Sequence, residues 1–142
     1  MTKLIFINLP VKDLARATAF YEAIGAKKNT QLSDDTASCM IVSDTINVML
    51  TTHAKYGQFT TKKIADAKTT SQVLLCLSAD SRAAVDTIVS KAGSAGGVID
   101  PSPQDDYDFM HGRSFEDIDG HLWGVNWMDF DLLAKHVNSP PA

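Results

Sequence analysis

The chain has 142 residues, of which 44% are hydrophobic and 21% are charged, and this is typical of one folded domain rather than a disordered chain. The 13 Lys and Arg residues against 17 Asp and Glu residues give a formal net charge of −4. Without a basic cluster, this balance argues against a nucleic-acid partner.

The sequence also argues against a membrane protein. No apolar run approaches the ~20 residues that cross a bilayer, and the first residues lack a signal-peptide pattern. Cys39 and Cys76 lie inside apolar runs and not in a Cys-x-x-Cys pair, which favours buried free thiols in a reducing compartment. We therefore expect a soluble, cytoplasmic protein.

The first part of the chain predicts one strand, one helix and three further strands. Residues 4–9 are mostly apolar, and Pro10 can end this first strand. Asp13 and Gly25 are suited to begin and end a helix over about residues 13–24. Turn residues then separate strands expected at 27–33, 37–42 and 46–52.

Residues 53–71 are polar and rich in lysine, and the segment is too long for a hairpin. We expect a crossover, a lid or both, with one helical turn near residues 62–67.

The same order of elements then starts again. An apolar strand at 73–77 precedes a helix that Ser81 can cap and Gly93 can end. Strands follow at 98–100, 110–117 and 121–128, with a turn-rich stretch at 101–108. A short helix after Asp131 and disorder from residue 138 onward complete the expectation.

The two halves match by position. Adding 68 to the residue number takes Phe6 to Leu74 and Gly25 to Gly93, so strand and helix end coincide. Such a repeat argues for duplication of one βαβββ module. We predict an α+β domain over 1–142, with module one at 3–52, a linker or lid at 53–71, module two at 72–129 and a tail at 130–142.

Strand alternation separates two faces of the expected sheet. The apolar parity, which includes Ile5, Leu9, Val73 and Trp123, is the side expected to pack against the helices. The other parity mixes amides with apolar groups, as a small-molecule pocket requires, although a solvent-facing sheet surface has the same pattern. We predict ligand-binding residues there: Phe6, Asn8, Asn47, Met49, Thr51, Leu74, Cys76, Leu122, Gly124 and Asn126.

Three motifs carry a family resemblance. They are Leu9-Pro10-Val11-x-Asp13-Leu14, Phe20-Tyr21-x-x-Ile24-Gly25 and Phe115-x-Asp117-x-Asp119-Gly120-His121-x-Trp123. Over about residues 3–129 the chain resembles the vicinal oxygen chelate superfamily of glyoxalase I, bleomycin-resistance proteins and extradiol dioxygenases, especially its lactoylglutathione lyase-like branch. The resemblance implies two βαβββ modules whose mixed sheet curls into a cup with helices on the outer face, a homodimer, and a metal in the cup of the enzymatic members.

The metal-ligand positions of that family do not carry suitable side chains here. They fall on Phe6, Met49, Leu74 and Gly124, none of which suits a divalent ion. A shift of the alignment by two residues would offer only Asn8, Asn47, Cys76 and Asn126. We therefore expect neither a catalytic metal nor another cofactor.

His111 and Arg113 are the candidate catalytic residues. They share one parity of a strand, so both face the cup or both face away, and the sequence does not decide which. Facing inward, Arg113 would bind a carboxylate or phosphate and His111 would move a proton. The alternative is an Arg paired with Glu116 or Asp117 and a histidine at a strand end.

The sequence thus favours a protein that binds a small organic molecule in the cup, as drug-binding resistance members of the family do, without the usual divalent metal. Two alternatives remain. One is a glyoxalase-type lyase or dioxygenase-like enzyme with a displaced metal site or metal-free acid/base chemistry. The other is a structural dimer without a ligand.

Overall fold

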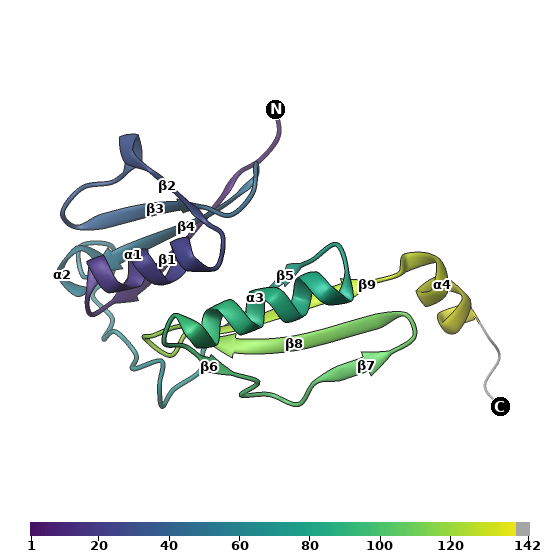
Figure 1. Ribbon diagram of the computed structural model, residues 1–142. Helices are drawn as coiled ribbons and strands as arrows, with labels where there is room; N and C mark the ends of the chain where they lie inside the picture. The colour runs from purple at the N-terminus through teal and green to yellow at the C-terminus, as the bar shows by residue number, and fades with distance from the viewer. Residues whose placement is uncertain (139–142) are drawn as a thin grey trace.

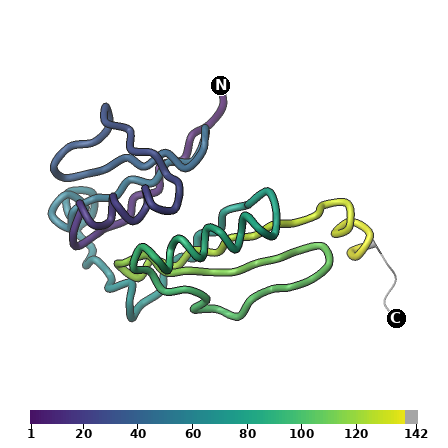
Figure 2. Tube along the Cα trace, viewed as in Figure 1, coloured from purple at the N-terminus to yellow at the C-terminus, as the bar shows by residue number. Residues whose placement is uncertain are grey.

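The computed structural model describes residues 1–138, in which two βαβββ modules follow one another along the chain (Figures 1 and 2). The elements of module one are β1 (Ile5–Val11), α1 (Leu14–Ala23), β2 (Lys27–Asn29), the 3-10 turn η1 (Thr30–Leu32), β3 (Ala37–Ile41) and β4 (Ile46–Thr52). After the short helix α2 (His53–Tyr56), module two comprises β5 (Leu74–Ser78), α3 (Arg82–Ser94), β6 (Val98–Ile99), β7 (Asp105–Tyr107), β8 (Met110–Glu116) and β9 (Leu122–Met128). Helix α4 (Phe130–Asn138) extends from the far end of module two (Figure 1).

Each module has its own mixed sheet. The strand order is β1-β4-β3-β2 in module one and β5-β9-β8-β6 in module two, where β7 also pairs with β8. In both sheets, the first strand pairs in parallel with the last strand, and the last strand pairs in antiparallel with the one before it. This shared topology confirms the predicted α+β fold built from two βαβββ modules.

The helix starts follow the predicted capping residues. The Asp13 carboxylate accepts a hydrogen bond from the Arg16 N–H at 3.1 Å, and the Ser81 hydroxyl accepts one from the Ala84 N–H at 3.0 Å. Gly25 has the expected positive φ of 109° after α1.

The predicted end of the second helix at Gly93 is wrong. Helix α3 continues to Ser94, and Gly96, with φ of 101°, is the residue in the left-handed conformation. Gly93 is needed for packing instead, because a Cβ there would lie 2.7 Å from the Ile99 side chain.

Several other expectations about local structure need correction. Residues 62–67 form no helix, and the helical turn occurs at α2, where the Thr52 hydroxyl caps the Lys55 N–H at 3.1 Å. The turn-rich stretch contains β7, and the strand expected at 27–33 ends at Asn29. The disorder predicted at the C-terminus falls mainly on residues 139–142, which lie outside the described part.

One hydrophobic core joins the two modules. Helices α1 and α3 lie side by side (Figure 1), and the buried cluster includes Val48 and Leu50 from module one together with Phe115 and Trp123 from module two. Ile5 and the equivalent Val73 were expected in the core, but each is 53% exposed, because Ile5 is the first residue of β1 and Val73 lies just before β5. Among residues 1–138, no helix has the length and apolar character needed to span a membrane.

Candidate functional site

Each sheet turns one face toward α1 and α3, and we call the opposite face its open face. In module one, Phe6 pairs with Asn47 and Asn8 with Met49, so these residues share the open face. In module two, Leu74 pairs with Leu122 and Cys76 with Gly124 in the same way. All the predicted ligand-binding residues except Arg113 therefore lie on one or the other open face, with Thr51 and Asn126 continuing the alternation.

The two open faces lie on the outside of the chain, because the helix-facing sides of both sheets contribute to the shared core. Phe6 is 43% exposed and Leu74 is 54% exposed, although both are large apolar residues. Neither face is enclosed at these two residues. The chain thus presents two partly apolar half-surfaces.

The polar groups on the open face of module one are bonded to their own sheet. The Asn8 amide donates to the Phe6 carbonyl at 3.2 Å, and the Thr51 hydroxyl donates to the Leu9 carbonyl at 3.4 Å. Asn47 is 7% exposed, and its amide lies 3.5 Å from the Ile5 carbonyl. These contacts fix the side chains in place and leave mainly apolar surface for a ligand.

The family's divalent metal does not fit the residues at its usual positions. Phe6 and Leu74 bring no donor atom, Gly124 has no side chain, and the Met49 thioether is a soft ligand. Within residues 1–138, no group of three or more His, Cys, Asp or Glu side chains could hold a metal ion. We therefore derive no chemical step that passes through a metal.

The two cysteines occupy different environments, so the expectation of two buried thiols is correct for Cys39 and wrong for Cys76. Cys76 is exposed on the open face of module two, and a Cβ at Gly124 would lie 2.9 Å from its Sγ, so glycine leaves room for the thiol. Cys39 lies on the open face of module one but is fully buried, and burial raises the pKa of its thiol.

His111 and Arg113 lie on the helix-facing side of β8, which decides the orientation that the sequence left open. His111 pairs with Trp127 and Arg113 with Val125, and both partners have the core parity. Arg113 therefore does not share a surface with the other predicted ligand-binding residues. The predicted partners Glu116 and Asp117 do not bond Arg113 either.

An ionic cluster holds these two side chains instead. His111 Nε2 lies 2.9 Å from Asp86 Oδ1, and Arg113 donates to Asp86 at 3.1 Å and to both oxygens of Asp100 at 3.0 and 2.6 Å. The hydrogen bond from His111 and then the one from Arg113 lower the pKa of Asp86, and Arg113 lowers the pKa of Asp100. The same two aspartates raise the pKa of Arg113.

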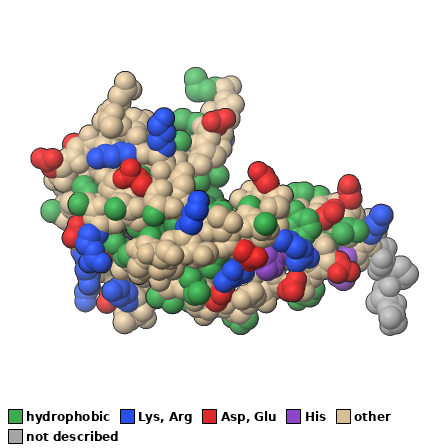
Figure 3. Space-filling model, viewed as in Figure 1, with side chains coloured by type: hydrophobic (Ala, Val, Ile, Leu, Met, Phe, Trp, Pro, Cys, Tyr) green, Lys and Arg blue, Asp and Glu red, His purple; other side chains and the backbone are tan. Residues whose placement is uncertain are grey.

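This cluster connects α3 and the segment after β6 to β8. Figure 3 shows histidine, basic and acidic side chains close together over module two. His111 is 9% exposed, and its Nδ1 has no hydrogen-bond partner in the described residues. The sequence gives no direct signal for Asp86, because only the fold brings α3 across β8.

A buried hydrogen-bonded chain joins the modules. The Tyr21 hydroxyl donates to Asp117 at 2.6 Å and accepts from the Trp123 indole at 3.0 Å. Burial raises the pKa of both Asp117 and Tyr21. Tyr21, Asp117 and Trp123 all belong to the motifs that carry the family resemblance, but their mutual contact was not predicted.

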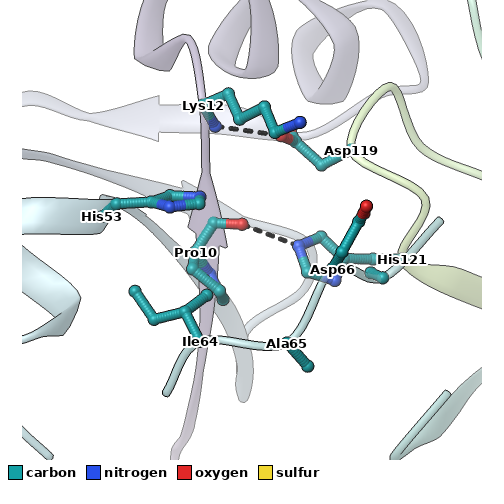
Figure 4. Close-up of a pocket in the computed structure, with 9 residues that line it drawn as sticks. Pro10, Lys12, His53, Ile64, Ala65, Asp66, Asp119 and His121 are labelled. Carbon is teal, nitrogen blue, oxygen red and sulfur yellow. Dashed lines mark hydrogen bonds between the residues drawn. The ribbon is translucent and has the colours of Figure 1, made fainter. Parts of the chain in front are cut away.

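A small pocket of about 130 Å³ lies where the two modules and the linker meet (Figure 4). His121 bonds the Pro10 carbonyl at 2.8 Å, and the Asp119 carboxylate accepts from the Lys12 N–H at 2.9 Å. Residues 64–67 of the linker form another wall. The linker therefore reaches the contact between the two modules.

Comparison with known proteins gives this arrangement a family. A family model described as Glyoxalase/Bleomycin resistance protein/Dioxygenase superfamily matches residues 3–125. The chain belongs to this superfamily. No curated protein matches the chain.

Solved structures share the fold of this chain. A hypothetical protein from S. aureus is 24% identical, with a TM-score of 0.75 over 89% of this chain and 95% of that chain. A glyoxalase/bleomycin resistance protein/dioxygenase family enzyme from Burkholderia phytofirmans is 19% identical, with a TM-score of 0.72 over 90% and 100%. The fosfomycin resistance protein FosX from Mesorhizobium loti is 18% identical, with a TM-score of 0.67 over 94% and 98%.

Proposed function

We propose that this superfamily member binds a small, largely apolar organic molecule on its open faces, without the divalent metal of the enzymatic members. The exposed apolar surface around Phe6 and Leu74 is the observation that carries the proposal. Contiguous exposed apolar surface marks ligand-binding grooves and protein interaction sites. The side-chain amides of Asn8 and Asn126 add a small number of orienting polar groups to this surface.

The proposed binding cup is completed by a second copy of the chain. One chain offers two open faces that do not cover each other, and within the described residues β1 and β5 each pair with a strand on one side only. A free strand edge beside exposed apolar side chains favours association. A twofold homodimer would set the open face of module one against that of module two in the partner.

The proposal concerns binding rather than catalysis. His111 has a carboxylate neighbour, as a catalytic base would, but it lies on the opposite side of β8 from the open face. Its partner Asp86 and the neighbouring Arg113 are committed to an ionic cluster within the chain. An enzyme that uses His111 would need its substrate on the helix side of module two.

A thermal-shift screen of neutral organic molecules, followed by open-face variants, tests this function. Leu74→Glu and Phe6→Glu place a charge on the open face, and Val137→Glu places the same charge on α4, where Val137 is 70% exposed. We expect Leu74→Glu and Phe6→Glu to abolish the shift and Val137→Glu to retain it. Binding that both open-face variants retain, and that the cavity substitution Ala26→Leu described below also leaves unchanged, would contradict the proposal.

Light scattering of the same proteins tests the dimer separately. We expect twice the chain mass for the wild type and Val137→Glu, and a shift toward the single-chain mass for Leu74→Glu. A single-chain mass for the wild type at every concentration would contradict the shared cup but not ligand binding itself.

A further inference from the structure

An apolar cavity of about 270 Å³ lies between the two modules. Module one lines it with residues from the end of α1 and from the β3–β4 turn, and module two lines it with residues of β5 and α3. Ile24 and Val42 contribute from one side, and Leu77 and Ile88 from the other. These aliphatic side chains are only partly buried, so the cavity lies at the edge of the shared core.

The chemistry of the lining selects for a neutral molecule. Among residues 1–138, no charged side chain lines this cavity. Trp123, Tyr21 and Phe115 provide aromatic walls, and the polar atoms of Trp123 and Tyr21 already bond one another and Asp117. The Ser43 and Ser78 side chains are the remaining polar groups of the lining. A charged ligand would lose its hydration here without gaining a partner.

The size of the cavity sets the size of its occupant. An apolar cavity of about 150 Å³ accommodates benzene, and this one is larger. We propose that the cavity between the modules is a second binding site, which takes a neutral aromatic or branched aliphatic molecule of roughly ten non-hydrogen atoms. Because both modules line it, the bound molecule would stabilise their packing. The proposal does not depend on a ligand at the open face.

Isoleucine methyl signals offer a direct test, because Ile24, Ile46 and Ile88 line the cavity whereas Ile64 and Ile99 do not. The probes are ethylbenzene and the charged molecule benzoate, which is of similar size. We expect ethylbenzene to shift the signals of the three lining isoleucines in a saturable manner and to leave those of Ile64 and Ile99 unchanged. Benzoate should shift none of these signals. Absence of a shift with ethylbenzene, or equal shifts with benzoate, would overturn the proposal.

Matched variants localise the binding. Ala26 lines the cavity, whereas Ala19 is exposed on α1. We expect Ala26→Leu to weaken ethylbenzene binding at least tenfold and Ala19→Leu to leave it unchanged. Ser43→Leu enters the cavity from the β3–β4 turn and is expected to cause the same loss should Ala26→Leu fail to fold. Unchanged affinity for ethylbenzene in a folded cavity variant would overturn the proposal. It would also be overturned if the methyl signals of the lining isoleucines shifted with protein concentration and not with ethylbenzene.

Discussion

Module one and module two share a topology but differ in which face carries polar groups. In module one, the open face holds the buried Cys39 and Asn47, and the helix-facing side is mostly apolar. In module two, the open face exposes Leu74 and Cys76, and the helix-facing side contains the ionic cluster around Arg113. The two modules thus share their backbone pairing, whereas the side-chain chemistry differs on each face.

The largest effect on stability is expected at the shared core, because both modules contribute residues to it. Trp123 is 1% exposed and bonds Tyr21 of module one. We expect Trp123→Ala to lower the free energy of unfolding by about 3–5 kcal/mol, because it leaves a cavity between the modules. Chemical denaturation followed by circular dichroism measures this, with the partly buried Trp127→Ala as a control of smaller expected loss. Two separate transitions in the wild type would contradict a shared core.

The ionic cluster of module two should contribute less than the core. Arg113→Met leaves Asp100 and Asp86 without their cation, and we expect a loss of about 1–3 kcal/mol. The exposed pair of Arg82 with Asp106 is the matched control, and Arg82→Met should cost about 1 kcal/mol or less. Equal effects of the two substitutions in denaturation experiments would show that burial of the cluster is unimportant.

The cluster also predicts a pH dependence in acid. Asp86 and Asp100 have lowered pKa values in the folded protein, so they add stability that is present above their unfolded pKa of about 3.9 and is lost as the pH falls through the folded values. We expect the melting temperature of the wild type to fall more steeply below about pH 4 than that of Arg113→Met. Burial raises the pKa of Asp117, so its contribution to the pH dependence of stability has the opposite sign, and this contribution is the same in both proteins. Parallel pH profiles would count against the cluster.

The smallest expected effect is a difference between the two thiols in their rate of chemical labelling. No change in stability is expected here. Cys76 is exposed, whereas Cys39 is buried and has a raised pKa. We expect iodoacetamide to label Cys76 at least about tenfold faster than Cys39, as measured by peptide mass spectrometry. In the proposed dimer, Cys76 labelling should also slow as the protein concentration rises. Equal labelling rates would show that the two open faces are equally accessible.

Much of the fold was predictable because hydrophobic alternation, helix caps and the repeat all agreed. Asp13, Ser81 and Gly25 act as expected, and the strand over residues 46–52 has the predicted bounds. The end of α3 was missed because Gly93 serves packing against Ile99 and not chain reversal.

The candidate site was predictable in part. Strand parity placed Phe6 and Leu74 on open faces, since alternation is a local property. Parity alone could not orient Arg113, because its side depends on the register of β8 against β9 and on Asp86 from α3. The contact of Tyr21 with Asp117 likewise depends on how the modules pack, which no local pattern encodes.

The central claim is that this chain has the superfamily fold without its metal ligands. Elemental analysis of the untagged protein tests it most directly, after exposure to Ni, Zn, Fe and Mn ions and removal of the excess. Because Phe6, Met49, Leu74 and Gly124 supply no hard or borderline donor, we predict no tightly retained ion. About one ion per chain would contradict the account and would return the protein to the metal-dependent enzymes.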